Sequence, residues 1–247
     1  MIAAFRNHWK VAPMNPYNPY APQATGAQLA SDSSAFLRKV YAYMAGGLFA
    51  TAVTATIVAS SETLVTLILG NPIVFYGLII GELGMVLAFS ALVNRLSTAA
   101  AAALFFAYAV VNGLTLSVIF LNYTASSIGS TFFVTAGTFG ALSAYGYATK
   151  RDLSGLGSFA MMGLIGLIIA SVVNLFLKSS MIYWLTTFVG VIVFTALTAY
   201  DTQKLKRFAS QASPAEQSKV ALQGALMLYL DFINLFLYLL RVLGRRR

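Results

Sequence analysis

Two stretches near the C-terminal end decide the fold class: residues 196–208 read ALTAYDTQKLKRF, and residues 226–238 read LMLYLDFINLFLY. Each stretch places a single aspartate, Asp201 or Asp231, in or beside a run of apolar residues. A charged acid near the centre of a membrane helix costs at least ~2.5 kcal/mol on insertion scales, so such acids usually face a bundle interior and pair with another group. The two stretches therefore predict membrane helices that carry functional acids.

The composition of the whole chain is that of a polytopic membrane protein. Of its 247 residues, 59% are hydrophobic and 9% are charged, whereas ordinary soluble domains carry roughly 25% charged residues. The net charge of +9 comes from basic residues in tails and loops, which indicates topology signals and lipid-facing anchors and not nucleic-acid binding. The chain has no cysteine, which excludes disulfides and thiolate chemistry, and its only histidine, His8, lies in the polar N-terminal tail.

The chain divides into a tail, residues 1–35, and a membrane domain, residues 36–247. The tail is rich in Pro, Asn, Tyr and Ala without an amphipathic period, which predicts disorder. The membrane domain holds seven apolar stretches that approach or exceed the ~20 residues needed to cross the hydrocarbon core. We expect seven transmembrane helices over residues 40–60, 72–93, 99–121, 128–149, 157–177, 181–203 and 215–243.

The charges in the loops predict the orientation. Basic residues precede the first stretch and follow the second, fourth and sixth, whereas the other gaps hold only Glu62, no charge, and Lys178. By the positive-inside rule the N-terminus is cytoplasmic. Seven crossings would place residues 245–247, all arginine, on the outer side against that rule. The last helix therefore either crosses or dips in and returns, and a crossing is favoured because late charges contribute less to orientation.

Asp201 and Asp231 can meet only if their depths in the membrane match. Residues 213–216 read SPAE, a capping-box sequence with proline at the first helical position. A helix from residue 214 reaches Asp231 after about 26 Å at 1.5 Å per residue. The depths match if the first turns of this helix project into the cytoplasm, which its polar start, AEQSKVALQ, favours. Contact between the two acids is therefore an open possibility.

Two carboxylates in contact cannot both ionise without a large cost, so they would share one proton. Such a pair separates when both groups ionise, which makes it a pH-sensitive latch. Clustered oxygens also suit Ca²⁺, so Asp201 and Asp231 are candidate metal ligands. Arg95 and Arg241 are the candidate counter-charges. Glu82 lies about 20 Å deeper than Arg95 along the second helix and is a candidate second station on an ion pathway.

The motifs AYDTQKLK at residues 199–206 and LYLDFINLFLYLLRVLG at 228–244 closely resemble the sixth and seventh helices of the Bax inhibitor-1-like family. GELGMVLAFS, which contains Glu82, and NGLTLSVIF at 112–120 resemble its second and third helices. The resemblance covers roughly residues 36–247. It implies a bacterial-type member in the inner (plasma) membrane, with a seven-helix fold whose C-terminal helix is central and is wrapped by the other six.

The same resemblance implies a pH-sensitive calcium leak in which aspartates matching Asp201 and Asp231 form the pH sensor. An arginine at the end of the second helix holds one aspartate in the family pattern, and Arg95 lies about one helical turn from that position. The resemblance implies no enzymatic activity and no bound cofactor other than Ca²⁺ as a permeant or bound ion. Some bacterial members are similar to proteins that bind a membrane-anchored AAA protease, so such a partner is a further expectation.

Three functions remain to be weighed. The first is the calcium leak. The second is a regulator of a membrane partner without transport of its own. The third is an intramembrane aspartyl protease, which Tyr200 and Asp201 suit, although LYLD at 228–231 stands where that family has G-x-G-D.

Overall fold

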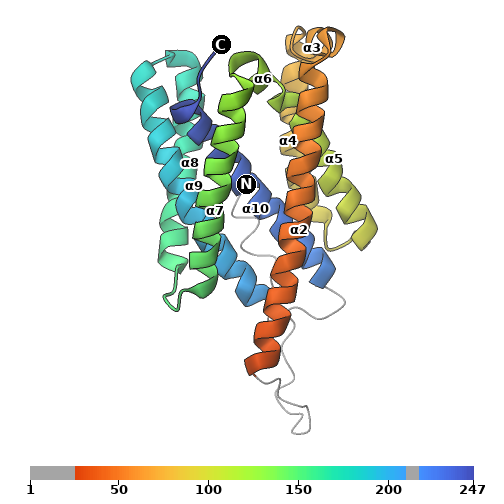
Figure 1. The fold of residues 1–247 in the computed structure, drawn as a ribbon, viewed down its shortest axis with the longest axis vertical. Helices are drawn as coiled ribbons and strands as arrows, with labels where there is room; N and C mark the ends of the chain where they lie inside the picture. The colour runs from red at the N-terminus through yellow and green to blue at the C-terminus, as the bar shows by residue number, and fades with distance from the viewer. Residues whose placement is uncertain (1–25, 210–216) are drawn as a thin grey trace.

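The computed structural model describes residues 26–209 and 217–247, with side chains described from Ser33 onward. Every regular element in these residues is a helix, apart from one isolated antiparallel bridge between Tyr123 and Arg246. Figure 1 shows a bundle of long helices, with the C-terminus at the end that carries α3 and α6. The predicted all-α class is confirmed. His8 and the cap predicted at residues 213–216 lie outside the described residues.

The helices follow the apolar stretches of the sequence. In chain order they are α2 (Gly26–Ala59), α3 (Glu62–Ile68), α4 (Pro72–Leu92), α5 (Thr98–Leu116), α6 (Val118–Asn122), α7 (Ala125–Ala148), α8 (Ser154–Leu177), α9 (Ser180–Ala209) and α10 (Gln217–Leu243). The third predicted stretch is divided between α5 and α6 at Ser117. Helix α2 includes residues 26–35, which the sequence analysis placed in the tail, and α9 continues past residue 203 to Ala209.

Short polar residues fix where several helices begin. Asn71 caps α4 by accepting a hydrogen bond from the Ile73 amide at 3.0 Å, and Pro72 occupies the first helical position. Ser97 caps α5 by accepting from the Ala100 amide at 3.2 Å. These side chains satisfy amides that have no partner within the helix. Helix α8 ends at Leu177, and the capping residue Lys178 adopts a left-handed conformation with φ of 49°.

Six helical segments of the described chain are long and apolar enough to cross a membrane. They are Ser33–Ala59, Pro72–Leu92, Thr98–Asn122, Ser154–Leu177, Ser180–Ala209 and Gln217–Leu243. Helix α7 has 24 residues, the same length as α8, but its Ser, Thr and Gly residues lower its hydropathy. Length and composition therefore support six of the seven expected crossings.

Helix α10 is the central element of the bundle. Half of its most apolar segment is buried, compared with 11% for α8 and 6% for α4. It packs mainly against α9, α2, α7 and α5, whereas α4 packs mainly on α5 and α8 mainly on α9. The expectation that six helices wrap the last one is therefore wrong in detail, because four helices surround α10 and two form an outer layer.

Close helix contacts occur at glycines that face a neighbouring backbone. Gly146 of α7 lies against the Ala199 backbone of α9, and Gly113 of α5 lies against Thr51 of α2. A side chain at either position would meet main-chain atoms, so glycine permits these approaches. The G-x-x-x-G pair Gly77 and Gly81 has a different setting, since a Cβ at either position would find no described atom within 4 Å.

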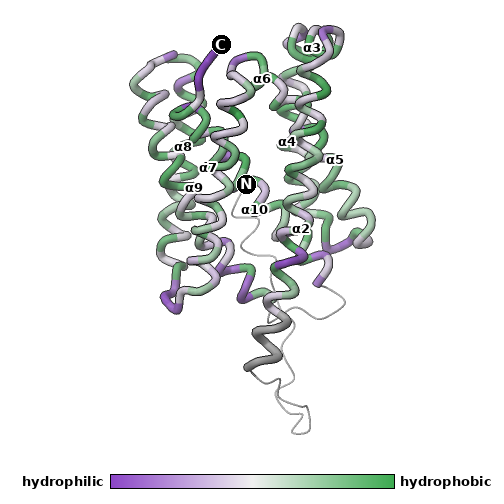
Figure 2. The backbone as a smooth tube through the Cα atoms, in the orientation of Figure 1, coloured by the Kyte–Doolittle hydropathy of each residue, from purple (hydrophilic) through white to green (hydrophobic). Residues whose placement is uncertain are grey.

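Hydrophilic residues gather at the two ends of the bundle. Figure 2 shows one such band at the connections between α4 and α5 and between α7 and α8, where α9 also ends and α10 begins. We call this the basic end, because its connections hold Arg95, Lys150 and Arg151, and the last turn of α9 holds Lys206 and Arg207. The C-terminal arginines lie at the other end, where Thr124 donates its backbone N–H to the Arg245 carbonyl oxygen at 3.1 Å.

Candidate functional site

The carboxyl groups of Asp201 and Asp231 meet between α9 and α10. Their residues are 6% and 5% exposed, and the two side chains are hydrogen-bonded to each other. An ionised carboxylate can only accept hydrogen bonds, so a bond between two carboxyls requires that one of them carries a proton. The two acids, whose contact the sequence left open, therefore interact across the α9–α10 interface, and a hydrogen bond between them requires one proton.

The residues around Asp201 point toward three different helices. The ring of Tyr200 covers Gly157 of α8, where a Cβ would come within 2.6 Å of ring atoms. Asp201 faces α10, and the Thr202 hydroxyl donates to the Ser143 hydroxyl of α7 at 3.3 Å. The motif thus fixes α9 against its neighbours as well as supplying an acid.

Gln203 ties the end of α9 to the connection between α7 and α8. Its Oε1 accepts from the Leu153 amide at 2.9 Å, and its Nε2 donates to the Arg151 carbonyl oxygen at 2.8 Å. Gln203 is buried, so both polar groups of its amide need partners. The two bonds hold the start of α8 beside the aspartate-bearing part of α9.

An ion pair at the surface supports the same junction. Arg207 Nη2 donates to Asp152 Oδ1 at 2.7 Å, and both side chains are about half exposed or more. Asp152 also accepts from the Ser154 amide and hydroxyl, at 3.0 and 2.7 Å. The bonds from Arg207 and Ser154 lower the pKa of Asp152 to about 2. Its carboxylate therefore stays ionised at any physiological pH.

One carboxyl oxygen of the aspartate pair lacks a partner. Asp231 Oδ2 is fully buried and forms no hydrogen bond within the described residues. Buried polar atoms are almost always satisfied, so an exception of this kind calls for a physical explanation. A further donor or a cation at this oxygen would satisfy it.

Lys204 supplies a positive charge close to the pair. It acts electrostatically on both Asp201 and Asp231, and it lies three residues after Asp201 on α9. Its ammonium is 5.9 Å from the centroid of the Tyr200 ring and 5.8 Å from that of Phe208. The sequence analysis did not propose this lysine as a counter-charge, although its spacing from Asp201 placed it on the same side of the helix.

The two arginines proposed as counter-charges lie elsewhere. Arg95 is exposed after α4, and its side chain forms no ion pair or hydrogen bond within residues 26–209 and 217–247. Arg241 stacks on aromatic rings, with its guanidinium 5.0 Å from the centroid of Tyr238 and 5.4 Å from that of Tyr183. The structure therefore brings neither arginine to Asp201 or Asp231.

Glu82 belongs to a separate polar network that joins four helices. Its carboxylate accepts from Asn112 Nδ2 at 3.0 Å and from the Thr115 hydroxyl at 2.6 Å, both on α5. The Tyr229 hydroxyl of α10 donates to Asn112 Oδ1 at 2.9 Å and lies 2.6 Å from the Thr51 hydroxyl of α2. We call these five residues the Glu82 network. It reaches α10 only two residues before Asp231.

The acids of the described chain do not gather into a larger metal site. Within residues 26–209 and 217–247, no group of three or more His, Cys, Asp or Glu residues could hold a metal ion. Ca²⁺ takes six to eight oxygen ligands, and two carboxyl groups together supply four. Asp201 and Asp231 therefore suit brief contact with a passing cation better than a resident ion.

The chain matches a known family model over residues 33–247, which cover the bundle from within α2 to the C-terminus. The description of that model is "Inhibitor of apoptosis-promoting Bax1". The chain belongs to this family. The resemblance seen in the sequence motifs is thereby confirmed, and the shared region begins within α2.

Bacterial relatives share nearly the full length of this Bax1-inhibitor family member. "Inner membrane protein YbhL" of Escherichia coli is 51% identical over 215 residues, covering 86% of this chain and 92% of the relative. Uncharacterized proteins of Borreliella burgdorferi and Rickettsia prowazekii are 45% and 47% identical, covering 86% of this chain and 92% and 90% of the relatives. The chain is therefore an integral membrane protein of a family with several bacterial members.

Sequence reasoning missed several polar residues of the site. Asn112 and Tyr229 connect Glu82 to α10, and Lys204 stands beside the aspartates. An asparagine within an apolar stretch is itself a signal, because an unpaired amide inside a membrane is costly. The sequence does not reveal that Glu82 is the partner of this amide, because the contact depends on how α4 packs against α5.

Proposed function

We propose that this chain is a pH-sensitive Ca²⁺ leak whose gate is the Asp201–Asp231 pair. The observation that carries the proposal is the buried hydrogen bond between two carboxyl groups at the interface of α9 and the central helix α10. A single proton holds this contact together. Its loss replaces a hydrogen bond with a repulsion between two negative charges.

The size of that repulsion is enough to move helices. Two like charges 4 Å apart repel by about 4 kcal/mol at an effective dielectric constant of about 20. Such an energy changes the equilibrium constant between two conformations by about three powers of ten. Ionisation of the pair therefore separates α9 from α10, and the resulting pair of carboxylates attracts divalent cations. The leak opens as the pH rises through the titration of the pair.

Glu82 provides the second acidic station of the proposed pathway. Its carboxylate is only partly buried, and Asn112 and Thr115 orient it from α5. The Tyr229 hydroxyl links this station to α10, which also carries Asp231. A cation that leaves one acidic station can therefore meet a second one along the same central helix.

The proposal includes a topology. Helix α7 makes the seventh crossing, since it equals α8 in length and packs against both α9 and α10. The basic end faces the cytoplasm, which places the N-terminus inside by the positive-inside rule. The membrane is the inner membrane of a bacterium, by analogy with the inner membrane protein of Escherichia coli.

A flux assay in proteoliposomes tests this function. The purified full chain is reconstituted with a Ca²⁺ indicator inside, and flux is measured across a series of pH values. The intact protein should conduct, with flux that rises with pH, and Asp201→Asn and Asp231→Asn should each flatten the profile. Glu62→Gln is the matched control, because Glu62 is an exposed acid at the opposite end and should leave the profile unchanged.

Two other outcomes of the same preparation would contradict the leak. Cleavage of membrane peptides that requires both aspartates would indicate an aspartyl protease. Absence of flux, together with tight association with a membrane-anchored protease, would indicate a regulatory partner.

A further inference from the structure

We propose that a pocket at the basic end, beside α9, binds a phosphate-bearing anion. The pocket has a volume of about 250 Å³ and is lined by Ser154, Tyr200, Gln203, Lys204, Arg207 and Phe208. We call it the α9 pocket. Its α9 residues recur at the spacing of a single helix face, and Ser154 is the first residue of α8. This inference does not depend on whether the protein conducts Ca²⁺.

The α9 pocket is large enough for a polar ligand. A cavity needs roughly 10–15 Å³ to hold one water molecule, so about 250 Å³ accommodates a phosphate group together with part of a head group. The pocket lies where α9 passes from apolar to hydrophilic residues (Figure 2). Lipid head groups and small cytoplasmic solutes meet at this level of a membrane protein.

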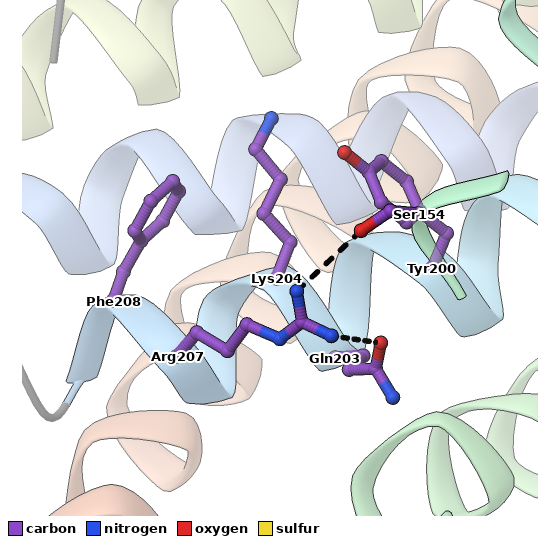
Figure 3. A pocket seen from close by; sticks show the side chains of 6 residues that line it. All are labelled: Ser154, Tyr200, Gln203, Lys204, Arg207 and Phe208. Carbon is purple, nitrogen blue, oxygen red and sulfur yellow. Dashed lines mark hydrogen bonds between the residues drawn. The ribbon is translucent and has the colours of Figure 1, made fainter. Parts of the chain in front are cut away.

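Two cations, Lys204 and Arg207, line the α9 pocket, and of these only Arg207 forms an ion pair within the described residues. Arg207 donates to Asp152 Oδ1 at 2.7 Å and to Gln203 Oε1 at 2.8 Å. Lys204 forms no hydrogen bond or ion pair within the described residues, and its ammonium lies near the Tyr200 and Phe208 rings instead. Figure 3 shows Lys204 between these two rings, while Arg207 faces Ser154 and Gln203. The pocket thus presents an ammonium that has no acceptor among the residues that the structure describes.

The other lining groups suit an anion as well. Arg207 adds a second positive charge to the pocket, and its guanidinium is held in place by Asp152, Gln203 and Ser154. The pocket also lies at the N-terminal end of α8, a helix of 24 residues, where the helix dipole favours negative charge. The Tyr200 and Phe208 rings restrict Lys204 to one side of the helix. These features favour a phosphate over a carbohydrate or an apolar ligand.

The phosphate can come from an anionic lipid head group or from a soluble molecule, and the binding experiment separates these sources. The full chain, purified in a non-ionic detergent, is titrated with short-chain phosphatidylglycerol, with the corresponding diacylglycerol and with inorganic phosphate. Binding is measured by calorimetry. We expect phosphatidylglycerol to bind and the phosphate-free diacylglycerol not to bind. Binding of inorganic phosphate at the same site would indicate a soluble ligand, and its failure to bind would indicate a lipid.

Matched variants assign the binding to Lys204. Lys204→Gln should weaken binding at least about tenfold, because a charge-assisted hydrogen bond is lost, whereas Lys204→Arg should stay within about threefold of the intact protein. Lys219→Gln removes a lysine at the same end that lies outside the pocket, and should have no effect. Asp152→Asn should tighten binding, since it frees the charge of Arg207.

The proposal is overturned if diacylglycerol binds as well as phosphatidylglycerol, or if Lys204→Gln binds like the intact protein. It is also overturned if none of the phosphate compounds binds. Because the assay measures binding alone, a failed Ca²⁺ flux experiment leaves its result unaffected.

Discussion

Tyr229 of α10 donates a hydrogen bond to Asn112 of α5 at 2.9 Å, only two residues before Asp231 on the same helix. These two residues of α10 therefore face different neighbouring helices. Tyr229 faces the Glu82 network, and Asp231 faces α9. The central helix therefore connects the two acidic stations through its own backbone.

Removal of the Tyr229 hydroxyl should destabilise the bundle. In Tyr229→Phe, the buried Asn112 Oδ1 loses its donor, which costs about 1–3 kcal/mol. Thermal unfolding in detergent should show a melting temperature several degrees lower than that of the intact protein. Tyr238→Phe is the control, since the Tyr238 hydroxyl forms no hydrogen bond within residues 26–209 and 217–247. Equal melting temperatures of the two variants would contradict the role given to the Glu82 network.

Alanine at Gly146 should destabilise the protein, whereas alanine at Gly77 should not. A methyl group at residue 146 meets the Ala199 backbone of α9, so α7 must shift, at a typical cost of about 1–3 kcal/mol. The same change at residue 77 enters open space and should be neutral or slightly stabilising, because alanine favours a helix over glycine. Thermal unfolding of both variants checks the pair, and a loss at Gly77 as large as that at Gly146 would contradict the packing described.

The different settings of these glycines show how much of the packing could be predicted from the sequence. Apolar runs placed the long helices near their observed positions, apart from the start of α2 at Gly26, because a helix must be long enough to cross the hydrocarbon core. The G-x-x-x-G spacing of Gly77 and Gly81 is typical of close helix contacts, but the pattern does not say which face of α4 turns inward. That choice depends on the neighbours of α4, which a local pattern cannot specify.

The acidic site was predicted only in part, because its partners also depend on how the helices pack. Asp201 and Asp231 stood out because charged residues are rare in apolar helices, and their contact is present. Arg95 was an inference from loop position, whereas the charge beside the pair belongs to Lys204 on α9 itself. The partners of Glu82 required the packing of α4, α5 and α10, which no spacing within one helix reveals.

The ion pair of Asp152 and Arg207 should survive strong acid. The pKa of Asp152 lies at about 2, below its ordinary value of 3.8. The pair is therefore fully formed above about pH 3.8, and its contribution is lost as the pH falls through about 2. Carboxyl ¹³C chemical shifts of Asp152 should titrate near pH 2, and Arg207→Gln should move the midpoint upward. A midpoint near 3.8 in the intact protein would contradict the observed bonds.

Lys204 should set the pH at which the leak opens. A positive charge near Asp201 and Asp231 favours their ionised forms, so its removal in Lys204→Gln should move the half-maximal flux to higher pH. Arg95→Gln and Arg241→Gln should leave the half-maximal pH unchanged, because neither arginine reaches the pair. Flux against pH in proteoliposomes distinguishes the three variants. If Arg95→Gln shifts the half-maximal pH and Lys204→Gln does not, Arg95 and not Lys204 is the counter-charge.

The most direct test of the gate is Ca²⁺ flux against pH for the intact protein, Asp201→Asn and Asp231→Asn. An amide cannot ionise, so neither variant can form two negative charges at the α9–α10 interface. The account predicts flux that rises with pH in the intact protein and a flat profile in each variant. A full pH response in both single variants would contradict it.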